Sequence, residues 1–289
     1  MPVYLRKPDW LKQGFINTET SNKIRKLIND LSLHTVCESA RCPNRPECYR
    51  HLVTTFMILG DTCTRKCTFC AVDKGNPLSP DPLEPNRIVQ AIKALGLKHV
   101  VITSVTRDDL PDGGASQFAR TVLAIREYNL NIPVEVLVPD FRGSYEALKI
   151  VIDSSPKIIS HNIETVRRLY TEVRPQASYT RSLDLLLKAK LYEPNILTKS
   201  GIMLGLGESR AEVLSTMFDL KAVGCDILTI GQYLVPSVNH HEVVKYISPR
   251  EFAEYADLGR QLGFAEVFSG PLVRSSLNAS EIYEQSTEF

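Results

Sequence analysis

Residues 54–70 read TTFMILGDTCTRKCTFC. The first part of this stretch, residues 54–60, is mostly apolar or β-branched, which predicts a short buried strand. Three cysteines follow that strand with the spacing C-x3-C-x2-C, at Cys63, Cys67 and Cys70. Parallel α/β folds carry their active sites at the carboxyl ends of their strands, so this loop is the first candidate site.

The alternation of strand and helix continues along the chain. Further strand-like runs lie at residues 99–104, 133–138, 157–163, 200–206, 227–234 and 264–270. Segments with apolar 3.6-residue periodicity separate them, at residues 87–95, 117–128, 181–191, 211–223 and 250–262. Continuous apolar strands that alternate with helices predict parallel βαβ units. The pattern favours an α/β fold, an incomplete (β/α)6 TIM-like barrel, with a doubly wound sheet as the alternative.

The barrel pattern leaves both ends of the chain outside it. We predict an N-terminal extension over residues 1–50, the barrel over residues 51–270, and a C-terminal extension over residues 271–289. No low-complexity linker separates a second domain.

Composition limits the partners. Of 289 residues, 43% are hydrophobic and 23% charged, and the formal net charge is +1. These values are ordinary for a globular protein, and they provide no basic field for nucleic acid. No apolar run is long enough to span a bilayer, and residues 1–14, MPVYLRKPDWLKQG, contain no signal-peptide core. We expect a cytoplasmic protein with neither a nucleic-acid nor a membrane partner.

A second group of three cysteines, Cys37, Cys42 and Cys48, lies in CESARCPNRPEC with spacing C-x4-C-x5-C. Three thiolates can hold three corners of a 4Fe-4S cluster and leave the fourth iron open to another ligand. Disulfides are disfavoured, because the chain has an odd total of seven cysteines and no secretion signal. Structural zinc is a second rival and would make the chain a binding module, but neither trio supplies the usual four ligands alone.

Polar side chains collect at the predicted carboxyl ends of other strands too. Examples are Arg107, Asp108, Asn162, Glu164 and Glu208. Each residue alone is most simply a loop residue or a helix cap. Because the carboxyl ends of parallel strands share one rim, their convergence favours an active site there.

The C-x3-C-x2-C loop, with Phe69 before its last cysteine, resembles the radical S-adenosylmethionine (SAM) superfamily. This resemblance implies that Cys63, Cys67 and Cys70 hold a catalytic 4Fe-4S cluster whose open iron chelates SAM. An electron from the reduced cluster would break the sulfonium C–S bond and release a 5′-deoxyadenosyl radical. Such a cleavage needs a low-potential donor, which a thiolate-held cluster can be, and a water-poor cavity beside the substrate.

The trio ahead of the barrel resembles the auxiliary-cluster motif of lipoyl synthases, and the similarity covers nearly the whole chain. The matching stretches are CESARCPNRPEC, FMILGDTCTRKCTFC, ITSVTRDDLPDGG, HNIETVRRLY, KSGIMLGLGE, IGQYLVPS and GPLVRSS. The resemblance implies a sulfurtransferase that inserts two sulfur atoms at C6 and C8 of a protein-bound octanoyl group. The auxiliary cluster would supply the sulfur, and two SAM molecules would be consumed for each lipoyl group. The alternative is another radical SAM sulfur-inserting enzyme, similar to biotin synthase, which needs neither the leading trio nor a terminal Arg-Ser-Ser.

In lipoyl synthases a serine in the pattern Arg-Ser-Ser-Tyr binds the fourth iron of the auxiliary cluster. Here residues 274–277 read RSSL, so leucine replaces the tyrosine. The resemblance implies Ser276 as this ligand, with a catalytic role, and Ser275 as the alternative. An alkoxide oxygen matches this iron less well than a thiolate, so its loss would expose a sulfide. Without the family match, either serine could cap a short helix over residues 276–285.

The resemblance also assigns residues to SAM itself. Asn162 and Glu164, in HNIET, are expected to contact its methionine or ribose part. Arg174 is a candidate for its carboxylate, since a guanidinium offers bidentate geometry. Ser104, at the end of the second strand, is a further cofactor contact.

For several other residues the expected roles are structural. Arg107 and Arg274 could form structural ion pairs with Asp108, Asp109 or Glu164. Residues 205–209, GLGES, lack the lysine of a phosphate loop and predict a tight turn that lets adenosine approach the backbone. His161 is expected to be satisfied by local hydrogen bonds, and Cys225 to be a small buried hydrophobe.

The resemblance implies two kinds of protein partner. One is the octanoylated lipoyl-carrier domain, on 2-oxoacid dehydrogenase E2 subunits and the glycine cleavage H protein. The other is a low-potential electron donor such as ferredoxin or flavodoxin. The expected cofactors are two 4Fe-4S clusters and SAM.

Overall fold

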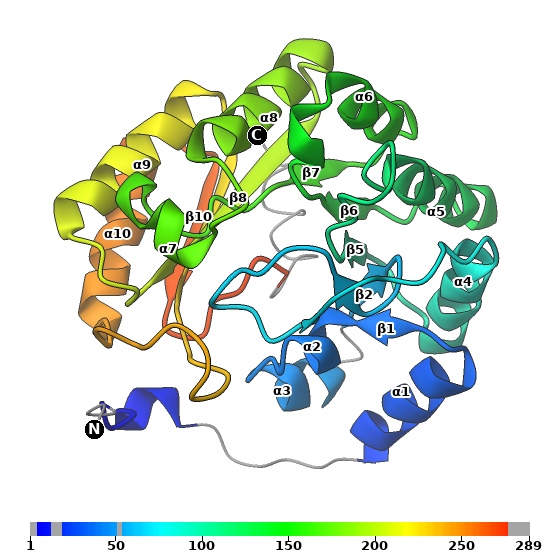
Figure 1. Ribbon diagram of the computed structural model, residues 1–289, viewed down its shortest axis with the longest axis horizontal. Helices are drawn as coiled ribbons and strands as arrows, with labels where there is room; N and C mark the ends of the chain where they lie inside the picture. Colours follow the sequence, from blue (N-terminus) through cyan, green and yellow to red (C-terminus); the bar gives the residue numbers. More distant parts are fainter. Residues whose placement is uncertain (1–4, 13–18, 51–53, 277–289) are drawn as a thin grey trace.

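The computed structural model describes residues 5–12, 19–50 and 54–276, and its strands form a ring that helices surround (Figure 1). The main sheet has eight strands in the order β1-β2-β5-β6-β7-β8-β9-β10. The strands are β1 His34–Thr35, β2 Thr55–Ile58, β5 Val100–Ser104, β6 Val134–Leu137, β7 Ile158–Ser160, β8 Leu197–Leu204, β9 Ile227–Gln232 and β10 Glu266–Gly270. From β2 to β10 all pairings are parallel, whereas β1 lies antiparallel to β2.

The strand order confirms the incomplete (β/α)6 barrel. Neighbours in the sheet are also neighbours in the chain, so every crossover advances around the ring in one direction. A doubly wound sheet would instead reverse its strand order at a switch point. Within the described residues β1 and β10 do not pair with each other, so the ring stays open, and β10 adds a last strand after the six β/α units.

Helices cover the outside of the ring between successive strands (Figure 1). They are α4 Glu84–Leu95, α5 Ala115–Tyr128, α6 Tyr145–Asp153, α8 Tyr179–Tyr192, α9 Arg210–Ala222 and α10 Pro249–Gln261. Three short helices lie in the segments that follow β6 and β7: η2 Phe141–Gly143, η3 Arg167–Leu169 and α7 Tyr170–Val173. The five expected helices are all present. The sequence analysis did not predict α6, which has nine residues.

The register shows which side chains face the inside of the ring. Gly201 of β8 pairs with Thr229 of β9, and a Cβ on Gly201 would lie 2.9 Å from Ser275 Oγ in the terminal segment. That segment, red in Figure 1, lies inside the ring, so these residues are on the inner face. By the same register Lys199 and Glu135 point inward, where Nζ and Oε2 form a buried ion pair of 3.0 Å.

The N-terminal extension packs against the open edge of the ring (Figure 1). Its helices are η1 Asp9–Leu11, α1 Glu19–Asp30, α2 Val36–Ser39 and α3 Arg45–Arg50. Ile24 and Ile28 of α1 are buried in the same hydrophobic core as the barrel. The division of the chain at residues 50 and 270 stays a prediction. None of the described helices combines the length and apolar character that crossing a membrane requires.

Candidate active site

The loop of residues 63–70 starts in a small sheet that the sequence did not predict. β3, Thr62–Cys63, pairs in parallel with β4, Asp73–Lys74. The pKa of Cys70 is raised to about 12, mainly by burial and further by the charges of Cys67 and Cys63. The three sulfur atoms therefore lie within electrostatic range of one another.

Backbone contacts hold this loop from several sides. Thr64 N–H donates to Thr106 O after β5, at 3.1 Å. Thr68 N–H donates to Val173 O at the end of α7, at 3.0 Å, and Thr68 O accepts from His241 N–H at 2.9 Å. These bonds join segments that are far apart in the chain. They fix where the cysteines lie, and nothing in the sequence pattern revealed them.

Three of the predicted cofactor contacts gather beside Cys67. Asn162 and Glu164 follow β7, and Asn162 Nδ2 donates to Glu164 Oε1 at 3.1 Å. Arg174 lies just after α7, and one guanidinium N–H donates to Asn162 O at 3.0 Å. The pKa of Cys67 is raised mainly by burial, while the Arg174 charge lowers it and the Glu164 charge raises it. The structure brings the three residues together at the cysteine loop, and their contact with SAM stays a prediction.

Arg174 and Glu164 have the properties of a site for a charged ligand. Arg174 is 9% exposed, and its buried Nε has no hydrogen-bond partner within the described part of the chain. Glu164 has a φ of 66°, a conformation that costs energy for a residue with a side chain. Burial raises the pKa of its carboxyl group. A ligand with a carboxylate and a neighbouring cation or hydroxyl, as SAM has, fits this pair.

Ser104 lies apart from this group. Its register partner is Ile58, and it shares a face of the sheet with Ile102 rather than with the inward-facing Thr103. The Ser104 Oγ is buried without a hydrogen-bond partner among the described residues. Its assignment to SAM stays a prediction, and the strand alternation does not favour it.

The second cysteine trio lies on two short helices at the open edge of the ring. Cys37 is in α2, Cys48 is in α3, and Cys42 is in the turn between them. The pKa of Cys37 is raised to about 11 and that of Cys48 to about 12, in both cases mainly by burial. The charge of Cys42 raises both further, so these three sulfur atoms also lie near one another.

The donor sets fit clusters rather than disulfides or a single ion. All seven cysteines are free, and Cys225 is fully buried as expected. In the described ranges, no three His, Cys, Asp or Glu side chains surround the position of one metal ion. A 4Fe-4S cluster needs no such convergence, because each thiolate binds a different iron at a separate corner. Two trios of free thiols supply three ligands for each of two such clusters.

The terminal segment, residues 270–276, touches the surroundings of both trios. Asn44, which lies between the second and third cysteines of the auxiliary trio, donates from Nδ2 to Leu272 O at 2.5 Å. On the other side, Ser275 Oγ donates to Asn162 Oδ1 at 2.9 Å. One short segment therefore connects the auxiliary cysteines with the predicted SAM contacts.

Arg274 lies between the two sites. Its pKa is lowered by burial, while the charges of Cys42 and Glu164 raise it. The segment approaches β9 closely here, since a Cβ on Gly231 would lie 2.1 Å from Val273 O. The charge of Glu164 acts on Arg274, but within the described residues the two side chains form no salt bridge.

Ser276 is half-buried, and its hydroxyl makes no hydrogen bond within the part of the chain that the structure describes. Ser275 is instead engaged by Asn162. This leaves Ser276 available as an iron ligand, and that role stays a prediction. Leu277 and the remainder of the helix expected over residues 276–285 lie outside the described residues.

The arginines and carboxylates after β5 form structural ion pairs. Arg107 pairs with Asp109 at 2.8 Å and also donates to Leu59 O at 3.3 Å. Asp108 pairs instead with Arg65, at 2.7 Å. Arg65 lies inside the cysteine motif and was missed, although its place between Cys63 and Cys67 was a visible signal.

The tight turn expected after β8 is confirmed, and other groups of the chain pack closely against it. Gly205 and Gly207 have φ values of 100° and 109°, and Glu208 Oε1 accepts the Gly205 N–H at 2.6 Å. A Cβ on Gly205 would lie 2.2 Å from Gln232 Nε2 and 2.4 Å from Lys245 O. The chain's own groups therefore occupy the space at Gly205, and the approach of adenosine to the turn of residues 205–209 stays a prediction.

His161 is satisfied locally, as expected. Its Nδ1 lies 2.8 Å from Val138 O, and its Nε2 lies 3.0 Å from Ser182 Oγ. Both ring nitrogens are therefore used within the fold.

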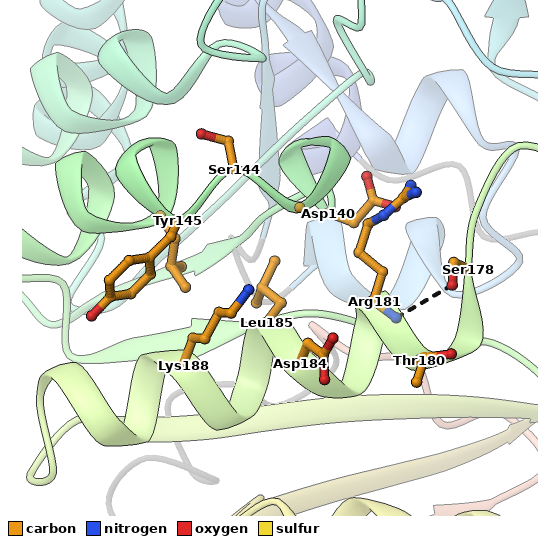
Figure 2. A pocket seen from close by; sticks show the side chains of 11 residues that line it. Asp140, Ser144, Tyr145, Ser178, Thr180, Arg181, Asp184, Leu185 and Lys188 are labelled. Atoms are coloured by element: carbon orange, nitrogen blue, oxygen red, sulfur yellow. Dashed lines mark hydrogen bonds and ion pairs between the residues drawn. The ribbon is translucent and has the colours of Figure 1, made fainter.

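A surface pocket of about 310 Å³ lies elsewhere, between α6 and α8 (Figure 2). Its wall includes Asp140, Ser144, Arg181 and Lys188. None of the six clustered cysteines lines it. Asp140 connects it with the cysteine loop, because Arg65 bonds to the Asp140 carboxylate at 2.5 Å.

Solved structures of two other enzymes share the fold. Methylornithine synthase (PylB) superposes with a TM-score of 0.56 over 83% of this chain and 73% of that chain, at 17% identity. Coproporphyrinogen III oxidase (HemN) from Escherichia coli, a radical SAM enzyme, gives 0.52 over 71% and 51%, at 14% identity. These identities are low, so the likeness concerns the fold alone.

Sequence comparison is more specific. Residues 57–220 match the radical SAM superfamily, and residues 3–42 match the N-terminal domain of lipoyl synthase of the radical SAM family. The lipoyl synthase of Caldanaerobacter subterraneus subsp. tengcongensis is 53% identical over 95% of this chain and 96% of its own length. That of Thermus thermophilus is 49% identical over 99% and 90%. The chain belongs to the lipoyl synthase family of the radical SAM superfamily.

Proposed function

We propose that this chain is a sulfurtransferase that inserts two sulfur atoms, at C6 and C8, into an octanoyl group on a carrier-protein lysine. The observation that carries the proposal is the place of residues 270–276. This segment bonds to Asn44 in the auxiliary cysteine loop and to Asn162 beside Cys67. The segment therefore connects the surroundings of the two sets of three free thiols, which supports a reaction that uses both clusters on one substrate.

When bound, two 4Fe-4S clusters and SAM supply hydrogen abstraction at C6 and C8 and the two sulfur atoms. The chain's task is to hold these groups. Arg174 binds the carboxylate of SAM through its otherwise unpartnered Nε. Glu164 accepts a hydrogen bond from the amino group or a ribose hydroxyl of SAM. Asn162 donates to the Glu164 carboxylate and so keeps it in place.

The chain also excludes water from the inner face of the ring. Ile158 and Ile227 are fully buried, with Leu197 and Phe268 packed against them. At the same level of the ring, Lys199 and Glu135 form a buried ion pair of 3.0 Å, since they are the register partners of Ile227 and Ile158. A radical intermediate needs such an environment, since exposed solvent components would compete for it.

Ser276 is proposed as the fourth ligand of the auxiliary cluster. Its hydroxyl makes no hydrogen bond among the described residues, whereas that of Ser275 bonds to Asn162. The test compares Ser276→Ala with Ser275→Ala. We expect the first variant to cleave SAM without transferring sulfur, and the second to transfer sulfur. The reverse result assigns the ligand to Ser275.

The family implies a lipoyl-carrier protein as substrate and an external electron donor. We propose octanoylated domains of 2-oxoacid dehydrogenase E2 subunits and of the glycine cleavage H protein as the carriers. For the donor we propose ferredoxin or flavodoxin, and for the compartment the reducing cytoplasm, in which free thiols persist.

Two measurements on the anaerobically purified protein test the function. Iron and sulfide analysis should give about eight of each per chain, for two clusters of four irons. Mass spectrometry of an octanoylated carrier peptide, after incubation with SAM and a reductant, should show two added sulfur atoms. A colourless, zinc-loaded protein, or a peptide that never gains sulfur from the fully loaded enzyme, would refute the proposal.

A further inference from the structure

Arg65 lies between Cys63 and Cys67 and is 4% exposed. Its Nε donates to Asp108 Oδ2 at 2.7 Å, and one NH2 proton goes to Asp108 Oδ1 at 2.9 Å. This is a bidentate pair, the strongest geometry available to an arginine and a carboxylate. A further bond of 2.5 Å runs from Arg65 to Asp140 Oδ1. The guanidinium therefore joins the cysteine loop to the ends of both β5 and β6.

Asp140 is the deepest member of this group. Its side chain is 0% exposed, and it also accepts from Arg181 at 3.2 Å and from the Arg142 N–H at 3.1 Å. The pKa of Asp140 is held well below its usual range by Arg65, although burial opposes this. Figure 2 shows Asp140 and Arg181 side by side at the edge of the pocket between α6 and α8. The carboxylate is thus fixed and charged.

The same arginine is in contact with the cysteines. The backbone N–H of Arg65 donates to Cys63 Sγ, with an N···S distance of 3.4 Å. Its charge also acts on Cys67, in the direction that favours the thiolate. No reaction step described above uses Arg65, Asp108 or Asp140.

We propose that Arg65 is a positioning residue that locks the loop of residues 63–70 onto β5 and β6, and that Arg65 and Asp140 together set the reduction potential of the cluster bound there. The second part rests on the proposed cluster assignment. Reduction adds an electron to the cluster, so a nearby fixed cation favours it and a nearby fixed anion opposes it. Both charges are buried and therefore poorly screened by solvent.

The experiment measures the reduction potential of this cluster in the holoprotein, by an anaerobic titration followed by electron paramagnetic resonance. The signal that changes on addition of SAM identifies the cluster. Asp140→Asn should make reduction easier by about tenfold in its equilibrium constant, about 59 mV for one electron. Arg65→Gln should shift the potential by a similar amount in the opposite direction. Arg65→Lys keeps the charge and should stay within about threefold of wild type.

Arg107→Gln is the matched control. Arg107 is 1% exposed and forms an ion pair with Asp109 at 2.8 Å, so its loss disturbs the fold in a similar way. It does not contact the cysteine loop in the described residues, and the potential should stay within about threefold of wild type.

Opposite shifts for Asp140→Asn and Arg65→Gln, with Arg65→Lys near wild type, support the proposal, because general loosening would not change sign. Shifts in the same direction, or potentials unchanged in both Asp140→Asn and Arg65→Gln, overturn it. If the Arg65→Gln variant binds no iron, the test rests on the reduction potentials of the Asp140→Asn and Arg65→Lys variants alone. A wild-type protein that holds the cluster but transfers no sulfur would contradict the proposed function and leave this inference standing.

Discussion

Arg174 shows how one side chain can serve both the fold and the site. Its Nη1 donates to Asn162 O and Ile163 O, at 3.0 and 3.2 Å, and to the Tyr170 hydroxyl at 3.0 Å. Its Nε remains without a partner in the described structure. The bonds to the backbone hold the guanidinium still, so little freedom remains to be lost when a carboxylate binds.

Replacing Arg174 by lysine should weaken SAM binding by about tenfold or more, because a charge-assisted hydrogen bond is worth about 1.5–3 kcal/mol. Lysine keeps the charge but lacks the planar fork. Tyr170→Phe is the control, since it removes one partner of the guanidinium and leaves Nε unchanged. Binding is measured on the cluster-loaded protein at equilibrium. Equal affinity for Arg174→Lys and wild type would remove Arg174 from the site.

His161 should make stability depend on pH. Burial lowers its pKa to about 4, from the usual 6.5. The unfolded chain therefore binds a proton below about pH 6.5 that the folded chain resists until about pH 4. Stability from this group is complete above pH 6.5 and falls as the pH drops, by up to about 1.4 kcal/mol per unit.

Urea unfolding of the metal-free chain between pH 7.5 and 5 measures this slope. His161→Gln should be less stable at neutral pH, because it loses the bonds to Val138 and Ser182. Its stability should decline less steeply with acid than that of wild type. Parallel pH profiles for the two proteins would show that His161 is not responsible.

The turn after β8 illustrates how an element is fixed by close packing. Gly205 has a φ of 100°, and the space for a Cβ is occupied by Gln232 and by Lys245 O. Gly96, at the end of α4, has a φ of 63° with nothing within 4 Å of its missing Cβ. A substitution at Gly96 therefore introduces backbone strain alone, whereas one at Gly205 adds steric overlap.

Gly96→Ala should cost about 1 kcal/mol of unfolding free energy, from backbone strain alone. Gly205→Ala should cost about 1–3 kcal/mol more, because the methyl group must displace Gln232 or the backbone. Urea unfolding of both variants at pH 7.5 provides the comparison. Equal losses would mean that the turn yields easily and does not constrain the end of β8.

Across the whole molecule, the two cysteine trios should be separable by substitution. Cys67→Ala should abolish SAM cleavage and leave iron bound by Cys37, Cys42 and Cys48. Cys42→Ala should still cleave SAM but form no lipoyl product, since the sulfur source is lost. Iron content, 5′-deoxyadenosine and product are measured for each. Lipoyl product from Cys42→Ala, or continued SAM cleavage by Cys67→Ala, would contradict the two roles.

The exposed side of the cysteine loop is the expected place for the electron donor. Lys66 lies within the loop, and Lys74 is the strand partner of Cys63. Both are exposed, and no salt bridge engages either in the described residues. Lys157, exposed just before β7 at the opposite rim, is the matched control.

The double variant Lys66→Glu/Lys74→Glu should turn over about tenfold more slowly with reduced flavodoxin or ferredoxin at low salt, because it loses the attraction to an acidic partner. The loss should shrink at high salt. Activity with dithionite should be unchanged, and Lys157→Glu should behave as wild type with both reductants. An equal loss with dithionite would mean that the lysines act on the cluster site and not on docking.

Much of this protein could be inferred from the chain alone. Apolar strand runs of 6–8 residues in alternation with helices predicted the open barrel, because burial of both faces of a parallel sheet leaves a clear pattern. The cysteine spacings predicted the two trios, since thiols that share one inorganic core must be close in the chain or on adjacent elements. Family resemblance then supplied Asn162, Glu164 and Arg174, which the fold places together.

Other features depend on contacts between distant parts of the chain. The salt bridges of Arg65 with Asp108 and Asp140 span 43 and 75 residues, and the bond from Asn44 to Leu272 spans 228. Periodicity reports only which face of an element is buried, so it could not pair these residues, nor show that Gln232 fills the space at Gly205. Local patterns predicted the elements and the candidate ligands, whereas the tertiary structure decided which residues lie beside them, because those contacts exist only once the open ring has folded around its terminal segment.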